Sequence, residues 1–401
     1  MDRSGTSRGP LDWLNFLLAD VQGGLGPFLA VYLTASRHWA PGTAGLMLTV
    51  GGLATVAAST PLGGLVDRIR WKRGLVAAAA AAVALAATAE ALFPFPWAVG
   101  AAQLGGGIAD AAFPPAIAAL SLGLVGRAAY SARVGRNQAW NHAGNVATAA
   151  LSGVAGWLLA PVAVLWGVTA FALASIAAVA LIDPHAIDHA VARGADDGPA
   201  QGARTGALRS IVTCRPLLLF TLAVTLFHFA NAAMLPLAGE RLGRGGSGGL
   251  GTLAMAGCIV IAQLVMVPAA LLVGRKAERW GRKPLLLIGF AALPVRGLLF
   301  ALLGSPAALL GIQALDGVGA GIFGAIFPIV IADLTRGTGR YNLTLGAATA
   351  CWGIGAALSN AVAGAIVDRL GFGAAFLALA AFALAALALL ALAVPETRRA
   401  A

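Results

Sequence analysis

The sequence predicts an all-α integral membrane protein with twelve transmembrane helices, arranged as two pseudo-symmetric six-helix bundles. Three observations support this fold class. The chain is 59% apolar and only 11% charged over 401 residues, a balance that no soluble domain of this size needs. Apolar runs of helix-spanning length recur from one end of the chain to the other. The two halves also share one pattern of glycines and charges at a fixed offset.

The apolar runs give the number of helices. Spanning roughly 30 Å of hydrocarbon takes about 20 mostly apolar residues in a helix. Runs of this kind, separated by charges or by Gly and Pro turns, predict spans at about 12–34, 42–66, 74–93, 97–124, 138–160, 162–183, 216–238, 250–273, 284–303, 307–332, 342–366 and 372–394. The first run is too long for a cleavable signal peptide and has no evident small-residue cleavage site. We therefore interpret it as the first membrane helix.

The net charge of +11 follows the topology of the spans and does not indicate nucleic-acid binding. Four basic residues fall on one side of the predicted membrane: Arg37, Arg241, Arg244 and Arg369. Arg296 lies within a span, and every other Lys and Arg falls on the opposite side. The positive-inside rule makes that side cytoplasmic. We expect both termini in the cytoplasm and the protein in the inner cell membrane.

One long polar stretch divides the chain. It predicts an N-terminal bundle at 1–183, a flexible cytoplasmic linker at 184–215 that is rich in Gly, Ala, Asp and Arg, and a C-terminal bundle at 216–401. The three cysteines have no ligand-like spacing and are interpreted as packing residues.

The halves match at an offset of 211 residues. Four positions in the loop after the second span recur after the eighth, and they pair as Gly63 with Gly274, Asp67 with Glu278, Arg68 with Arg279, and Lys72 with Lys283. The same offset relates Gly144 to Gly355, Gly153 to Gly364, and Asp20 to Asn231. One register shared by several helices predicts a parallel internal repeat.

The repeated loop resembles the loop motif of the major facilitator superfamily: a glycine, three residues, an acid, an arginine and then a basic cluster. The second copy, GRKAERWGRK, fits closely, whereas the first has Arg70 where the family usually has glycine. The resemblance implies a monomeric transporter that is not an enzyme and has no cofactor. It also implies that Gly63, Asp67, Arg68, Lys72, Gly274, Glu278, Arg279 and Lys283 form a cytoplasmic latch. Plain topogenesis by positive charge remains the alternative for this loop.

Polar side chains inside the spans point to the transport site, because a charge at the centre of a membrane helix costs about 2.5–3.5 kcal/mol. Asp20 precedes Gly23, Gly24, Gly26 and Pro27, a run that can break the helix beside a cavity. We predict proton coupling at Asp20, with Asp110 as the alternate site. Binding of a cationic substrate group and a purely structural carboxylate are the alternatives for Asp20.

In the resembling fold the first, fourth, seventh and tenth helices line the cavity. The substrate-cavity candidates are Gln22, Asn137, Trp140, Asn141, His142, Asn145, His228, Asn231, Asp316 and Trp352. Asn137, Asn141 and Asn145 form one polar stripe at a spacing of four, which serves either substrate binding or contact between helices. We expect Arg296 and Glu90, which lie outside the cavity helices, to pair with a neighbouring helix or to snorkel.

These features predict a proton-coupled secondary transporter of a small organic solute. Efflux by proton antiport is the first choice, and uptake of an organic solute or a metal complex by proton symport is the alternative. The chain has no phosphate-binding GxxxxGK[ST] loop. The histidines are dispersed, which disfavours an enzyme, and we predict no metal centre. A site made of His142, His228 and Asp20 is the metal-binding alternative, and a channel is the other class that stays open.

Overall fold

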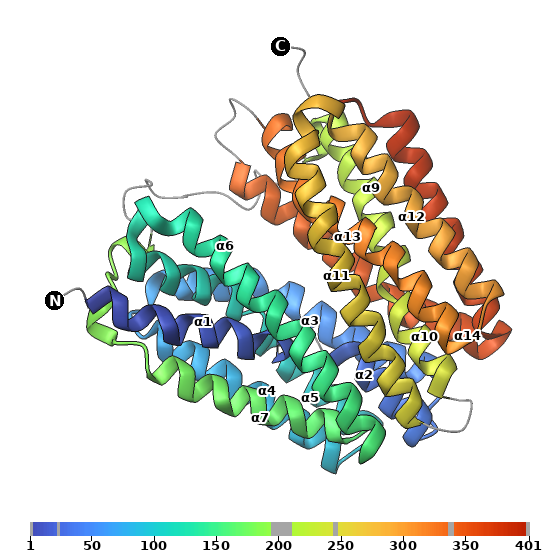
Figure 1. Ribbon diagram of the computed structural model, residues 1–401, viewed down its shortest axis with the longest axis horizontal. Coiled ribbons are helices and arrows are strands. Elements are labelled where there is room, and N and C mark those ends of the chain that lie inside the picture. Colours follow the sequence, from blue (N-terminus) through green and yellow to red (C-terminus); the bar gives the residue numbers. More distant parts are fainter. Residues whose placement is uncertain (1–2, 22–24, 194–210, 244–247, 336–340, 398–401) are drawn as a thin grey trace. The chain divides into compact units, whose positions relative to one another are not determined.

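The computed structural model describes residues 3–21, 25–193, 211–243, 248–335 and 341–397, and the described part of the chain is helical. The helices are α1 (Arg3–Val21), α2 (Leu25–Val31), a π-helical turn η1 (Tyr32–Ser36), α3 (Pro41–Arg68), α4 (Lys72–Leu92), α5 (Pro96–Asp110), α6 (Phe113–Leu158), α7 (Ala163–Ala180), the 3-10 turns η2 (Pro184–Ala186) and η3 (Val191–Arg193), α9 (Arg215–Ala232), α10 (Met234–Gly243), α11 (Gly248–Trp280), α12 (Arg282–Leu302), α13 (Pro306–Leu334) and α14 (Tyr341–Ala393). Figure 1 labels the longer of these elements.

Nine stretches of the described chain are long and apolar enough to cross a membrane. One of them, Thr344–Ala393, has 50 residues and breaks at Gly371 (φ 84°, ψ 171°), so it supplies the eleventh and twelfth spans. The first predicted span corresponds to α1, α2 and η1. The fifth corresponds to the part of α6 that follows Gly126 (φ 71°, ψ 174°). Together they account for the twelve helices expected from the sequence.

The observed helix ends differ from the predicted spans in two instructive places. The fourth span, predicted as one run, is two helices, because α5 ends at Asp110 and α6 begins at Phe113. The fifth helix starts just after Gly126 rather than near residue 138. Its first turns carry several arginines, so hydropathy alone assigned them to a loop, whereas a helix is free to continue beyond the hydrocarbon layer.

The chain folds into two compact units. The first contains Met1–His38, Val50–Pro199 and Gly246–Ala256, and the second contains the remaining residues. In the first unit α1 packs on α6, and α4 packs on α5 and α7 (Figure 1). In the second unit α14 packs on α9 and α12, and α12 also contacts α13. Each unit encloses its own apolar core, as expected for helices that bury one face against another.

The start of the predicted linker is ordered. The backbone N–H of Asp188 donates to Gly123 O in α6 (2.9 Å), and Ile187 and Ala192 are buried. A Cβ at Gly123 would lie 2.9 Å from Ile187 Cγ2, so the absence of a side chain there permits the contact. This part of the predicted linker therefore packs on α6, and residues 194–210 lie outside the described residues.

The repeat has a structural counterpart in two close helix contacts. A Cβ added to Gly144 in α6 would collide with the backbone oxygen of Phe16 in α1. At the related position in the second unit, a Cβ on Gly355 in α14 would lie 2.9 Å from Thr225 O in α9. Small residues let membrane helices approach closely, and here they do so at matching positions of the two halves.

We expect Gly144→Ala to destabilise the first unit by about 1–3 kcal/mol, because the new methyl group forces α1 and α6 apart. Gly135→Ala is the matched control, since a Cβ at Gly135 in the same helix meets no atom within 4 Å. Removing a helical glycine there should be neutral or stabilise by up to about 1 kcal/mol. SDS-induced unfolding in mixed micelles measures both variants, and equal effects would contradict the close contact.

Candidate functional site

Asp110 lies at the break in the fourth span. Pro114 and Pro115 lack N–H groups, so the carbonyl groups of Asp110 and Ala111 lose their usual helical partners and the helix is interrupted. Irregular backbone at membrane depth is tolerated only where it is buried in protein or lines a water-filled cavity. The Asp110 side chain is partly buried, and within the described residues it makes no hydrogen bond or ion pair. It is an unneutralised carboxylate in a predicted span.

A break also interrupts the seventh span. The helix α9 ends at Ala232 and α10 begins at Met234. The predicted break after Asp20 falls on residues 22–24, which lie outside the described residues, so it stays a prediction. The side chain of Asp20 and the whole of Gln22 lie outside the described residues. The proton-coupling role of Asp20 therefore stays a prediction.

Arg296 centres a buried polar network in the second unit. Its Nη1 donates to Asn231 Oδ1 of α9 (2.5 Å) and to Asp316 Oδ1 of α13 (2.7 Å), and its Nη2 donates to Gln313 Oε1 (3.0 Å). Gln313 Nε2 donates in turn to Asp316 Oδ2 (3.0 Å). Arg296 is 1% exposed, whereas the Asp316 side chain is 18% exposed. The network joins three helices and satisfies both carboxylate oxygens of Asp316.

Two expectations about charged residues are confirmed by these contacts. Arg296 pairs with neighbouring helices, as expected for a residue outside the cavity helices. Glu90 of α4 is 1% exposed and accepts a hydrogen bond from Gln103 Nε2 of α5 (2.7 Å). Asn231 and Asp316, which the sequence placed among the substrate contacts, hold Arg296 in this structure. Gln313 was missed, although its position three residues before Asp316 on one helix was a usable signal.

Aromatic rings gather one helical turn before Asn231. The His228 ring stacks on Trp352 of α14 (centroids 4.2 Å apart, 29°) and meets Phe323 of α13 edge-on (4.5 Å). His228 Nδ1 lies 3.0 Å from Val224 O, so it carries a proton, because a carbonyl only accepts. In the neutral ring Nε2 is then an acceptor. Trp352 Nε1 is buried and has no partner among the described residues.

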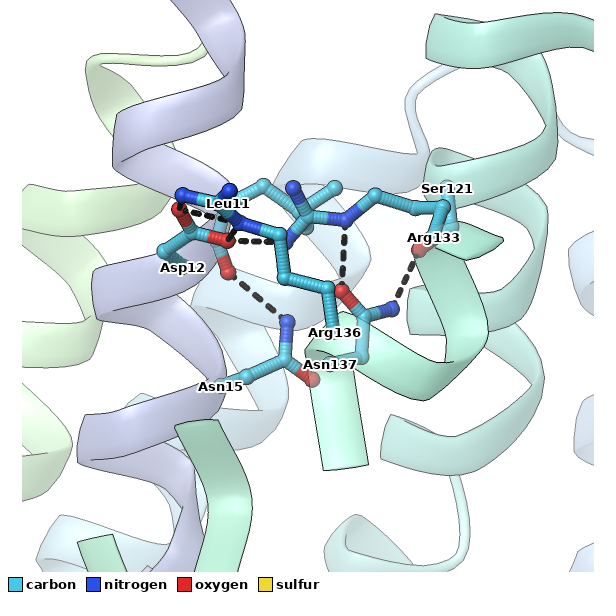
Figure 2. Close-up of polar contacts among 7 residues, drawn as sticks. All are labelled: Leu11, Asp12, Asn15, Ser121, Arg133, Arg136 and Asn137. Carbon is cyan, nitrogen blue, oxygen red and sulfur yellow. Dashed lines mark hydrogen bonds and ion pairs between the residues drawn. The ribbon is translucent and has the colours of Figure 1, made fainter. Parts of the chain in front are cut away.

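A charged cluster joins α1 to α6 in the first unit (Figure 2). Arg133 donates through Nη2 to Asp12 Oδ1, and Arg136 donates through Nη2 to Asp12 Oδ2 (2.6 Å). Arg133 Nε also donates to Asn137 Oδ1 (2.7 Å), and Asn137 Nδ2 donates to Ser121 Oγ (2.8 Å). The side chains of Asp12 and Arg133 are 3% and 4% exposed, whereas that of Arg136 is 59% exposed.

The asparagine stripe divides into two parts. Asn137 belongs to the charged cluster and is buried, which favours its role in helix contact. Asn145 Nδ2 donates to the backbone and side-chain oxygens of Asn141 (both 3.1 Å), and the two side chains are only partly buried. Trp140 lies against Trp13 of α1 (5.5 Å between ring centroids). His142 is also partly buried. Asn141, Asn145 and His142 keep accessible surface for a solute.

The charged cluster was not predicted from the sequence. Asp12 stood at the edge of the first predicted span and was counted with its apolar residues. Arg133 and Arg136 were assigned to a loop and counted only for topology. The available signal was their spacing of three, which places both guanidinium groups on one face once the segment is helical.

The loop motif has different geometry in its two copies. In the second copy one residue, Gly281 (φ 95°), separates α11 from α12. In the first copy three residues separate α3 from α4, and Arg70 stands at the position that corresponds to Gly281. Residues with a Cβ rarely adopt a positive φ, so Arg70 does not suit the one-residue turn made by Gly281. The connection between α3 and α4 is correspondingly longer.

Lysines of the motif bind carbonyl groups at helix ends. Lys72 is 1% exposed, and its Nζ donates to Val66 O (2.6 Å) and Ile69 O (3.0 Å) at the end of α3. Lys283 Nζ donates to Ala391 O of α14 (2.8 Å). Such contacts place positive charge where helix carbonyls are unpaired. Gly63, Arg68 and Arg279 are described as well, whereas the side chains of Asp67 and Glu278 and the surroundings of Gly274 lie outside the described residues.

No group of three His, Cys, Asp or Glu side chains among the described residues is placed to hold a metal ion. The alternative site of His142, His228 and Asp20 includes a side chain outside this set, so it has no structural support here. The cysteines Cys214, Cys258 and Cys351 are free.

Comparisons with known proteins identify the family. The family model of the Major Facilitator Superfamily matches residues 12–293 and 258–401. A protein of Mycobacterium tuberculosis strain H37Rv, named an uncharacterized MFS-type transporter, is 48% identical over 388 residues, which cover 96% of this chain and 93% of that protein. A protein with the same description from strain CDC 1551 gives the same values.

Solved structures show the same fold. A mutant of the nucleoside transporter NupG has a TM-score of 0.83 at 17% identity and covers 96% of this chain and 99% of its own. A D-xylose-proton symporter has a TM-score of 0.73 at 15% identity and covers 98% of both chains. The fold and these similarities define a multi-pass membrane transporter, not an enzyme. The chain belongs to the Major Facilitator Superfamily.

Proposed function

We propose that the protein is a proton-coupled secondary active transporter of a small organic solute. Two bundles rock about a central site to give alternating access, and efflux by proton antiport is the favoured direction. The observation that carries the proposal is Asp110, a carboxylate at a helix break in a span, for which the described residues supply no partner. A buried carboxylate in this setting is stabilised by taking up a proton or by facing water.

These two ways of stabilising Asp110 couple proton binding to the orientation of the transporter. The charged form of Asp110 favours an orientation in which the carboxylate meets water, and the neutral form tolerates an orientation in which it is enclosed. A ligand or proton shifts the equilibrium only as far as its affinities for the two orientations differ. Asp20 stands before the glycine and proline run of the first span and remains the other proposed coupling site.

The substrate contacts that we propose combine stacking with hydrogen bonds. Trp352 and His228 offer ring faces, a buried N–H donor and an acceptor nitrogen within one group of helices. Such a surface suits a planar ring with hydrogen-bonding edges. Asn141, Asn145 and His142 are the proposed contacts from the first unit. NupG is a nucleoside transporter, so nucleosides are the first solutes to test.

The remaining predictions complete the proposal. The loop-motif residues act as a cytoplasmic latch that is made in one orientation and released in the other. Both termini are cytoplasmic, the protein resides in the inner membrane, and it works as a monomer. The bias of basic residues toward one side of the spans supports this topology.

Asp110→Asn should abolish coupling while leaving solute binding intact, because the amide is isosteric but takes up no proton. A panel of nucleosides and pentoses, scored by thermal stabilisation of the purified protein at two pH values, first identifies a solute. That solute is then added to proteoliposomes that contain a pH-sensitive dye. The wild type should change the internal pH when solute is added, and Asp110→Asn should match empty liposomes.

Asp188→Asn is the matched control, because Asp188 lies in an exposed loop where its carboxylate only caps the backbone N–H groups of Ala190 and Val191. Asp20→Asn tests the alternate coupling site in the same assay. Wild-type pH changes in both Asp110→Asn and Asp20→Asn would refute carboxylate coupling at these positions. The sign of the change separates the directions: entry of solute with acidification indicates symport, and with alkalinisation indicates antiport. The D-xylose-proton symporter among the similar structures makes symport the second candidate.

A further inference from the structure

A cavity with a volume of about 320 Å³ opens in the first unit where the start of α4 meets the end of α7. Its volume falls within the range of small-molecule sites, roughly 300–1,000 Å³. The walls are basic and aromatic on one side, with Arg70, Arg73 and Trp71, and apolar on the other, with Ala77 and Ile176. None of the proposed coupling or substrate-binding residues lines this cavity.

One of the two guanidinium groups at this cavity is held by hydrogen bonds. Arg73 Nε donates to Val179 O (3.1 Å) and its Nη2 to Ala180 O (2.6 Å), so the guanidinium closes the last turn of α7. Arg70 is exposed, and no acidic side chain among the described residues binds either arginine. Asp183 and Asp188 lie in the following segment, but neither lines the cavity. Two guanidinium groups beside one opening favour an anionic ligand.

The aromatic wall is also positioned by the sequence. A Cβ on Gly74 would collide with Cε3 of the Trp71 ring, so the glycine lets this ring lie against the first turn of α4. Trp71 remains 60% exposed. Tryptophan is enriched where membrane helices cross the headgroup region, because its ring is apolar and its N–H is polar. We therefore expect the cavity to lie near the depth of the lipid headgroups.

The chain segments that form the cavity also carry exposed leucines. Leu85 of α4 is 71% exposed, and Leu173 of α7 and Leu181, which follows α7, are 55% and 73% exposed. In a membrane protein such faces contact acyl chains. A ligand that enters the cavity from this side has to combine an anionic head with an apolar tail.

We propose that this cavity binds an anionic phospholipid. Its phosphate lies between Arg70 and Arg73, its glycerol backbone lies against Trp71, and its acyl chains run down the exposed faces of α4 and α7. The site is separate from the solute pathway proposed above. It makes the stability of the first unit depend on the lipid composition of the membrane.

The test uses the full-length purified protein in detergent micelles doped with phosphatidylglycerol or with phosphatidylcholine, with thermal unfolding as the readout. Phosphatidylglycerol should raise the melting temperature in a saturable way, and phosphatidylcholine should do so weakly. Arg70→Gln should weaken the apparent affinity for phosphatidylglycerol about fivefold, the effect expected for one basic residue at an anionic surface. Arg70 makes no hydrogen bond in the described structure, so this variant should fold normally.

Arg215→Gln is the control with the same change of net charge, because Arg215 is an exposed arginine at the first residue of α9. It should leave the affinity for phosphatidylglycerol unchanged. Glycerol 3-phosphate distinguishes a lipid site from a site for a soluble anion. Equal stabilisation by the two lipids, equal affinities of Arg70→Gln and the wild type, or full stabilisation by glycerol 3-phosphate alone would each overturn the proposal.

Discussion

Asp316→Asn should destabilise the second unit by about 3–5 kcal/mol, because it leaves the buried guanidinium of Arg296 without a counter-charge. The asparagine keeps the shape of the aspartate and one oxygen acceptor, so the loss reports charge and not packing. Arg296 has almost no access to water and cannot lose its proton. The buried positive charge of Arg296 therefore persists in the variant without compensation.

Removing Arg296 while keeping Asp316 is expected to lower the stability less. In Arg296→Met the remaining carboxylate of Asp316 retains partial access to water, since its side chain is 18% exposed. The double variant Arg296→Met/Asp316→Asn removes both charges and should recover much of the loss, because a buried pair that is removed together leaves no unpaired charge. SDS-induced unfolding of the wild type, the two single variants and the double variant gives a double-mutant cycle. If the double variant were as unstable as the sum of the single ones, the pair would not be coupled.

The fold class was predictable from sequence because its two signals depend only on residue type and spacing along the chain. Apolar run length gives the spans, and the offset of 211 residues gives the repeat. The repeat also identified single residues at helix contacts. Gly144 and Gly355 each lie where an added Cβ would meet the backbone of a neighbouring helix. These features depend on residue type and spacing alone.

The polar networks were harder to predict, because they depend on which helices become neighbours. Nothing in the sequence near Arg296 indicates that Asn231, 65 residues away, will accept its hydrogen bond. Asp12 and Arg133 are 121 residues apart and belong to segments that hydropathy treated as an apolar run and a loop. Inside a membrane protein, a buried charge predicts that a partner exists, but only the packing of the helices identifies it.

Asp12→Asn should weaken the first unit about as strongly as Asp316→Asn weakens the second. Asp12 is the acidic partner of two arginines, and one of them, Arg133, is buried with it (Figure 2). Without the carboxylate, a buried cation loses its counter-charge and α1 loses its ionic contact with α6. We expect a cost of about 3–5 kcal/mol in SDS-induced unfolding.

Arg136→Gln provides the internal control for this cluster. Arg136 is mostly exposed, so its ion pair with Asp12 is screened by water and should contribute little to stability. The buried pair of Asp12 and Arg133 survives in that variant, and so does the hydrogen bond from Arg133 to Asn137. The expected order of stability is therefore wild type, then Arg136→Gln close behind, then Asp12→Asn far below. An Arg136→Gln variant as unstable as Asp12→Asn would show that the exposed arginine, and not the buried one, holds α1 against α6.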